Sequence, residues 1–123
     1  MLRAFLFVGF GGAIGSMARY GVSLVVNRLY TQSFPLATFL INILGCFIIG
    51  LLFGLAQKNN SLQSDSWLIM TTGFCGGFTT FSAFALENSN LLKDNLSMTA
   101  LLYTILSVVI GILLCRLGIN LTA

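Results

Sequence analysis

Charged residues leave three long uncharged runs in the sequence, at residues 29–57, 66–86 and 95–115. A fourth apolar run, residues 4–26, contains a single charge, Arg19. Each run is about as long as the roughly 20 residues that an α-helix needs to cross a bilayer. The pattern therefore predicts four transmembrane helices, over residues 3–28, 36–57, 66–91 and 97–120.

The composition favours lipid over water as the solvent. Of the 123 residues, 57% are hydrophobic and 7% are charged. A soluble domain of this size keeps many residues in contact with water and could not bury so much apolar surface in one core. Glycines interrupt the first apolar run and three more runs follow it, which argues against a cleaved secretory signal. We expect an all-α membrane protein with one domain, residues 1–123.

Short polar connections separate the predicted helices, so neighbouring helices should run antiparallel. Lys and Arg are then almost balanced between the two ends of the bundle, with Arg3, Lys58 and Arg116 against Arg28 and Lys93. Since an excess of these residues on one side normally fixes orientation, three against two predicts insertion in both directions and an antiparallel homodimer. A single orientation fixed by a few of these charges is the alternative.

Small residues recur at helical spacing. Gly11 and Gly15 are four residues apart, as are Gly50 and Gly54. In lipid, such pairs let helix backbones approach closely. They predict tight helix packing, which any multi-span protein needs, and say nothing about function.

Several kinds of chemistry are disfavoured. Histidine is absent, which removes the commonest general base and transition-metal ligand. The three cysteines, Cys46, Cys75 and Cys115, are far apart and lack the spacing of a zinc site or a disulfide framework. We expect packing roles for the cysteines, no enzymatic activity and no nucleic-acid partner.

The third apolar run contains the most unusual segment. Residues 76–80 place two glycines before two threonines, with one phenylalanine between the pairs. These are poor helix formers, so we expect a break there. Irregular backbone at membrane depth must be buried or line a cavity, and its freed carbonyls suit a hard cation such as Na⁺. A simple kink repaired by threonine hydroxyls is the alternative.

Five polar or aromatic residues could face an ion. Phe81 and Phe84 share a helix face, and the positive edges of their rings can attract an anion, although packing is their ordinary role. Asn42 can donate to an anion or bind a neighbouring helix. Tyr103 and Ser107, four residues apart, can solvate an ion or tie helices together.

Arg19 costs about 2.5–3.5 kcal/mol to place at mid-bilayer if it is left alone. We therefore expect it to face a water-filled vestibule or to pair across a dimer. In a vestibule its charge would raise the local concentration of anions. Glu87 is the candidate partner, or else a residue at the rim.

These residues resemble the Fluc family of fluoride channels, also called CrcB. The resemblance covers essentially the whole chain and is most specific at residues 73–87, where Gly-Gly-x-Thr-Thr-Phe-Ser-x-Phe is followed by a glutamate. It implies a dual-topology homodimer with two antiparallel pores. Such a protein would pass fluoride out of the cell through the bacterial inner membrane and so lower cytoplasmic fluoride.

The resemblance also implies roles for individual residues. The fluoride pore would use Asn42, Phe81, Phe84, Tyr103 and Ser107. A structural Na⁺ at the dimer centre would be held by the backbone carbonyls of Gly76 and Thr79. Two positions depart from the family pattern: Ala83 replaces a threonine and Gly111 replaces a serine found in some members.

A cation exporter and a non-transporting assembly protein are the two alternative functions. A small multidrug-type exporter is also a short, four-helix, dual-topology protein, but cation export needs an acidic residue within the bundle, usually in the first helix. The first span here contains Arg19 and no acid. A non-transporting assembly protein would carry no ion flux, and the sequence leaves that alternative open.

Overall fold

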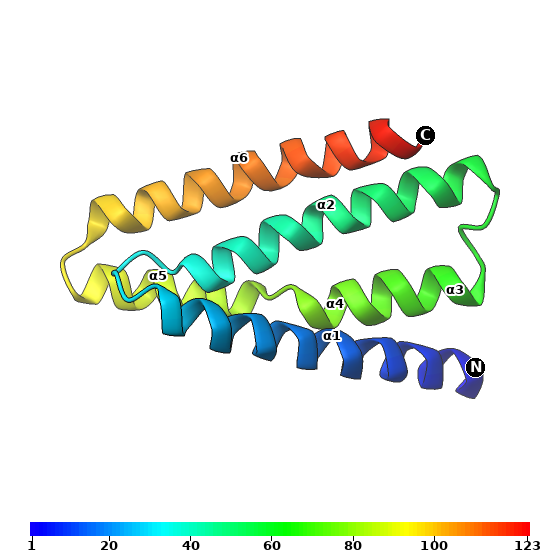
Figure 1. Ribbon diagram of the computed structural model, residues 1–123, viewed down its shortest axis with the longest axis horizontal. Helices are drawn as coiled ribbons and strands as arrows, with labels where there is room; N and C mark the ends of the chain where they lie inside the picture. The colour runs from blue at the N-terminus through cyan, green and yellow to red at the C-terminus, as the bar shows by residue number, and fades with distance from the viewer.

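The computed structural model describes residues 1–123 and contains four long helical regions (Figure 1). These are α1 (Leu2–Leu29), α2 (Leu36–Lys58), a segmented third region from Asp65 to Lys93, and α6 (Ser97–Thr122). All four are long and apolar enough to span a membrane. The predicted helices are confirmed, with limits that agree within two residues.

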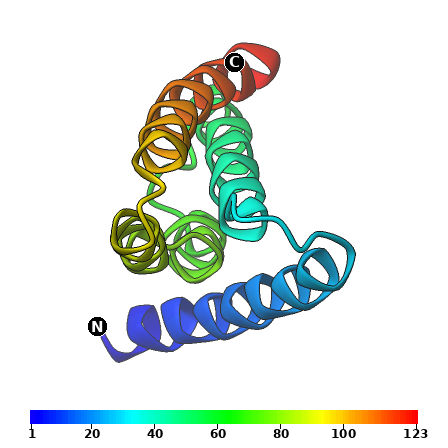
Figure 2. The ribbon, with the colours of Figure 1, turned by 90° about the vertical axis from the view of Figure 1, so that its left-hand side faces the viewer.

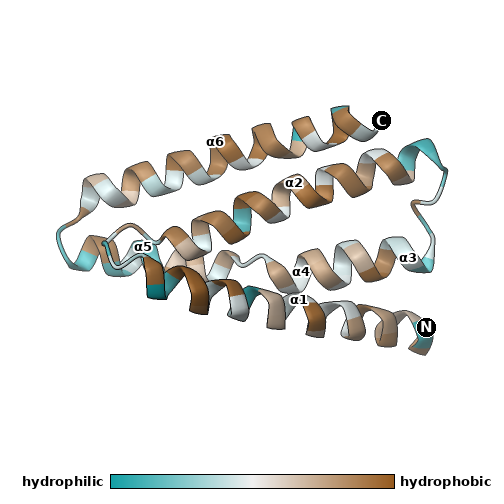
Figure 3. Cartoon of the chain, in the orientation of Figure 1, coloured by the Kyte–Doolittle hydropathy of each residue, from teal (hydrophilic) through white to brown (hydrophobic).

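Neighbouring helices run antiparallel, as predicted, and both termini lie at the same end of the bundle (Figure 1). Hydrophobic residues cover the helices, whereas hydrophilic residues gather at the connections (Figure 3). Only 18 of the 123 residues are buried. Most apolar side chains therefore face outward, where lipid or another protein surface must cover them.

Asparagines help to end two of the helices. Asn60 follows α2 with φ 52°, and Asn95 follows the third region with φ 61°. Both lie in the left-handed region, which asparagine tolerates better than most residues with a Cβ. The chain can therefore turn back sharply at both ends of the bundle.

The helices form two closely packed pairs. One pair joins α1 to the first half of the third region, and the other joins α2 to α6. Viewed along the bundle, α1 lies on one side, α2 and α6 lie on the other, and the third region lies between them (Figure 2).

Glycines permit this close packing, as the sequence predicted. A methyl group on Gly11 would lie 2.9 Å from the backbone nitrogen of Phe74 and 3.0 Å from the Cα of Gly73. A methyl group on Gly50 would lie 3.0 Å from the carbonyl carbon of Cys115 in α6 and would overlap its oxygen. Such overlap with backbone can be relieved only by moving the helices apart.

Gly50→Ala should therefore destabilise the fold by about 1–3 kcal/mol, the usual cost of overpacking. Gly21→Ala is the matched control, because it lies in α1 with nothing within 4 Å of an added methyl group. That variant should be neutral or slightly stabilising, since alanine favours helix over glycine. The measurement is the fraction of monodisperse protein left after heating in detergent. Equal stability of the two variants would contradict the packing described above.

The third region is divided into segments. It begins with α3 (Asp65–Leu68) and the π-helical segment η1 (Ile69–Cys75), continues as α4 (Gly76–Phe78), and resumes as α5 (Phe81–Lys93). Thr79 and Thr80 between α4 and α5 have extended backbone. The two halves are offset sideways from one another in the end view (Figure 2).

The predicted break is confirmed, but the glycines do not form it. Gly76 and Gly77 are helical, and only the two threonines leave the helix. Packing explains the difference: a methyl group on Gly77 would lie 3.1 Å from the Cα of Gly12 in α1. Gly77 therefore allows α1 to approach, while β-branched threonines favour extended backbone. The π-helical segment was not predicted.

Candidate functional site

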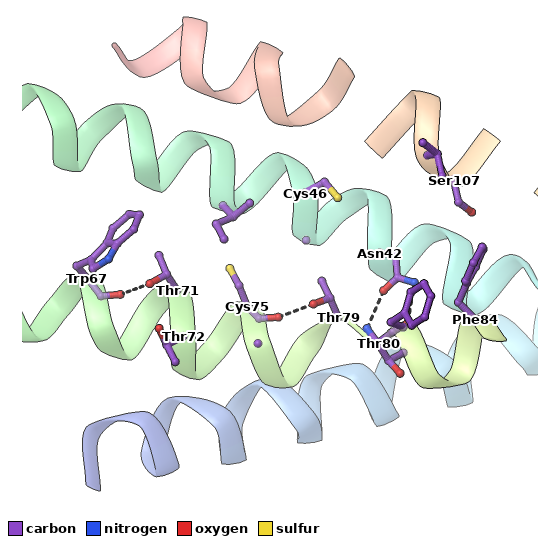
Figure 4. Close-up of a pocket in the computed structure, with 15 residues that line it drawn as sticks. Asn42, Cys46, Trp67, Thr71, Thr72, Cys75, Thr79, Thr80, Phe84 and Ser107 are labelled. Carbon is purple, nitrogen blue, oxygen red and sulfur yellow. Dashed lines mark hydrogen bonds between the residues drawn. The ribbon is translucent and has the colours of Figure 1, made fainter. Parts of the chain in front are cut away.

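Asn42 in α2 forms hydrogen bonds with the extended segment that breaks the third region. Its Nδ2 donates to the carbonyl oxygen of Thr80 at 3.0 Å, and its Oδ1 accepts from the N–H of Thr80 at 2.8 Å (Figure 4). Both backbone polar groups of this extended residue are thereby satisfied inside the span, where water cannot do so. One amide hydrogen of Asn42 is left over for another acceptor.

Arg19 in α1 forms a hydrogen bond next to the same break. Its Nε donates to the carbonyl oxygen of Gly77 at 3.1 Å, close to the end of α4. The helix end carries unpaired carbonyls and partial negative charge, so a guanidinium is well placed there. Its terminal nitrogens make no hydrogen bond or ion pair within the chain. The sequence missed this partner because it is backbone rather than a side chain.

The threonine hydroxyls complete the local structure. Thr79 Oγ1 donates to the carbonyl oxygen of Cys75 at 2.8 Å, and Thr80 Oγ1 accepts from the N–H of Ala83 at 3.1 Å, which caps α5. The hydroxyl repair considered for a simple kink is thus present. It is incomplete, because no turn, loop or side-chain hydrogen bond ends on the carbonyl of Gly76 or Thr79.

A groove of about 670 Å³ opens between α2, the third region and α6 (Figure 4). Six predicted site residues line this groove: Asn42, Gly76, Thr79, Phe81, Phe84 and Ser107. The rest of its lining is mostly apolar or hydroxylated and includes Trp67, Thr71, Cys46 and Cys75. No charged side chain lines the groove.

Phe81 and Phe84 both line the groove. Their ring centroids are 5.6 Å apart with an interplanar angle of 38°, so the rings are tilted rather than stacked. Phe84 is half-buried and packs against Tyr103, with centroids 4.9 Å apart. Phe81 is 79% exposed. One chain therefore positions Phe84 but leaves Phe81 uncovered.

Ser107 points from α6 toward the groove (Figure 4). Its Oγ is buried and has no hydrogen-bond partner. A buried hydroxyl without a partner costs free energy, and native proteins seldom leave one without a reason. Ser107 is thus a free donor on the wall of the groove.

A second, smaller cavity of about 300 Å³, here called the vestibule, lies beside the α1–α2 connection. Arg19 and Glu87 both line it, together with polar residues that include Ser23, Asn27, Gln32, Ser33, Thr38 and Thr80. Arg19 therefore lines a cavity whose wall is largely polar. No ion pair joins Arg19 to Glu87.

Glu87 is held by neighbours from two other helices. Its carboxylate accepts from Tyr103 Oη at 2.8 Å and from Thr38 Oγ1 at 2.7 Å. Tyr103 is completely buried and lines neither cavity, so within one chain it ties α6 to α5. Tyr103 and Ser107 share a helix face as expected, yet only Ser107 reaches the groove.

Thr38 and Thr80 are site residues that the sequence did not single out for chemistry. Thr38 is one helical turn before Asn42, and that spacing places both on the same face of α2. The spacing alone could have identified Thr38. Nothing in the sequence marks Thr80 apart from Thr79, because their surroundings differ only after α4 and α5 have packed.

The sequence is similar to a family of membrane proteins along almost its whole length. The family described as CrcB-like protein, Camphor Resistance (CrcB) matches residues 6–119. A fluoride-specific ion channel, FluC, from Azobacteroides pseudotrichonymphae is 46% identical over 122 residues, which is 99% of this chain and 98% of the relative.

Other relatives carry the same description. The FluC of Flavobacterium psychrophilum is 42% identical over 96% of this chain and 95% of its own length. The FluC of Chlorobium phaeobacteroides is 47% identical over 89% of this chain and 84% of its own length. These relatives are described as channels rather than enzymes.

Proposed function

The chain belongs to the CrcB family of multi-pass membrane proteins, and we propose that it is a fluoride channel of the bacterial inner membrane. The family is one of ion channels rather than enzymes. The observation that carries the proposal within this chain is the groove, which combines aromatic rings, free polar donors and no charge. Fluoride would move passively down its gradient, so that cytoplasmic fluoride falls.

The groove offers substitutes for the water that fluoride must lose. Asn42 has one unused amide hydrogen, Ser107 has an unpaired hydroxyl, and the ring edges of Phe84 carry partial positive charge. Favourable contacts must remain weak enough for the ion to leave, and a neutral lining meets that requirement better than a fixed cation does. Arg19, in the vestibule, would attract anions without binding them inside the groove.

We propose further that two copies, inserted in opposite directions, close the grooves and form two pores. A groove that is open in one chain, with Phe81 largely exposed beside it, lacks a wall. The near balance of positive residues at the two ends of the bundle supports both orientations. By the resemblance, Tyr103 would join the polar track of the pore in the assembled dimer.

A structural Na⁺ would be held by the backbone carbonyl oxygens of Gly76 and Thr79 at the break. The carbonyls of Gly76 and Thr79 accept no turn or side-chain hydrogen bond, and carbonyl oxygens are hard ligands. No group of three His, Cys, Asp or Glu side chains is available to hold a metal instead. Exchanging Na⁺ for a large organic cation should lower the thermal stability of the dimer. Unchanged stability would show that the protein holds no structural Na⁺.

The direct test of function is fluoride efflux from liposomes that contain purified protein, followed with a fluoride electrode. We expect fluoride efflux well above that of empty liposomes, and little chloride efflux under the same conditions. Equal fluoride and chloride rates would contradict a selective channel, and no efflux would favour the non-transporting alternative. The cation-exporter alternative has less support, because α1 and the groove lack an acidic side chain.

A further inference from the structure

Thr80 lies at the boundary between the two cavities. The groove and the vestibule are each lined by 15 residues, and Thr80 is the one that they share. On the vestibule side its neighbours include Arg19 and Glu87, and on the groove side they include Asn42 and Phe84. Thr80 is therefore the residue through which the linings of the two cavities meet.

The backbone of Thr80 is rigidly held. Asn42 fixes both its N–H and its carbonyl oxygen, at 2.8 Å and 3.0 Å. Its φ of −151° and ψ of 118° place the residue in extended backbone just before α5. The side chain therefore projects from a fixed point, which is the property required of a residue that solvates an ion repeatedly.

The hydrogen bonds of the hydroxyl leave its proton available. Thr80 Oγ1 accepts from the N–H of Ala83 at 3.1 Å, so that bond uses a lone pair and not the O–H. Its other neighbour, Ser82 Oγ, lies 3.2 Å away, and either hydroxyl can be the donor of that bond. If Ser82 donates, the O–H of Thr80 is free to rotate toward an anion.

We infer that the hydroxyl of Thr80 is the transfer point at which fluoride leaves the vestibule and enters the aromatic groove. This inference rests on the proposed function, since it assigns a step within the same path. The ion passes from the region of Arg19 to the Thr80 hydroxyl and then to the edge of Phe84. The N–H of Ala83, bonded to the same oxygen, polarises the hydroxyl and makes it a better donor.

Three variants test the transfer point by fluoride efflux from liposomes. Thr80→Val is nearly isosteric but has no hydroxyl, and it should lower efflux by about 10- to 100-fold, the usual effect of removing a hydrogen bond to a charged partner. Thr80→Ser should recover efflux relative to valine. Thr80→Asp keeps an acceptor for the N–H of Ala83 but puts a negative charge in the path, and it should abolish efflux.

Thr80→Val also removes the cap of α5, and variants of Ser64 are the control for that effect. Its Oγ accepts from the N–H of Trp67 at 3.1 Å, which caps α3 as Thr80 caps α5, but it lines neither cavity. Ser64→Val and Ser64→Asp should therefore conduct like the wild type. If Ser64→Val lost as much efflux as Thr80→Val, loss of a cap would explain both and the inference would be overturned.

The other outcomes distinguish failure of the proposed channel function from failure of the Thr80 transfer point. If the wild-type protein carries no fluoride, the proposed function fails. If the wild type conducts and both Thr80→Val and Thr80→Asp conduct equally well, the transfer point is wrong while the channel stands. Should Thr80→Val fail to elute as a monodisperse dimer, Thr80→Asp, which retains the cap, decides the question.

Discussion

Replacing Phe84 or Phe81 with isoleucine should lower fluoride efflux by at least about tenfold while leaving the protein assembled. Isoleucine keeps a large apolar side chain, so burial changes little. It has no ring edge, and the partial positive charge that the ring presents to an anion is lost. The 5.6 Å separation of the two centroids and their position beside the groove make both rings candidates for this contact.

Phe10→Ile is the matched control for these variants. Phe10 lies on α1, is 62% exposed and lines neither cavity, so its exposure is comparable to the 79% of Phe81. We expect wild-type efflux from this variant. Efflux from reconstituted liposomes and elution on size exclusion should be measured together. Unchanged efflux in both groove variants would show that the rings serve only for packing.

Asn42→Leu should disrupt both stability and transport, because the backbone of Thr80 loses its partners. The N–H and carbonyl of Thr80 would be unpaired at membrane depth, each at a cost of about 1–3 kcal/mol, so about 2–6 kcal/mol in all. The break would then collapse or rearrange, and the groove with it. We expect heated samples in detergent to lose monodisperse protein at a lower temperature, and liposomes to show no fluoride efflux.

A second variant distinguishes the stabilising hydrogen bonds of Asn42 to Thr80 from its contact with the ion. Asn42→Asp keeps an oxygen for the N–H of Thr80 but cannot donate to its carbonyl, and it adds a negative charge to an uncharged groove. It should be more stable than Asn42→Leu and equally inactive. Asn90→Leu, at an exposed position of α5 without a side-chain hydrogen bond, is the control. Equal stability of Asn42→Leu and this control would show that the hydrogen bonds of Asn42 to Thr80 do not stabilise the fold.

The membrane architecture was predictable because charge is so costly in lipid that it marks the ends of the spans. The glycine pairs were equally informative, since only a missing side chain allows two backbones to approach. The exact break was not predictable from propensity. Gly76 and Gly77 are poor helix formers, yet both are helical, Gly77 packs closely against α1, and Thr79 and Thr80 form the extended segment instead.

The sequence singled out six of the residues that line the groove, but not how they are arranged around it. Arg19 and Gly77 are 58 positions apart in the sequence, and a backbone acceptor carries no mark in the residue letters. Tyr103 and Ser107 share one helix face, yet the tyrosine turns to Glu87 and the serine to the groove. Which of these residues reaches a cavity is decided only when the helices pack.

We propose that the groove left open in one chain is closed by a second chain inserted the other way. Both termini lie at the same end of the bundle, so one accessible tag at the C-terminus reports the orientation of each copy (Figure 1). The decisive measurement is labelling of that tag by a membrane-impermeant reagent, first in intact cells and then after the membrane is opened. The proposal predicts that about half of the copies are labelled before opening. Labelling of all copies, or of none, in intact cells would contradict it.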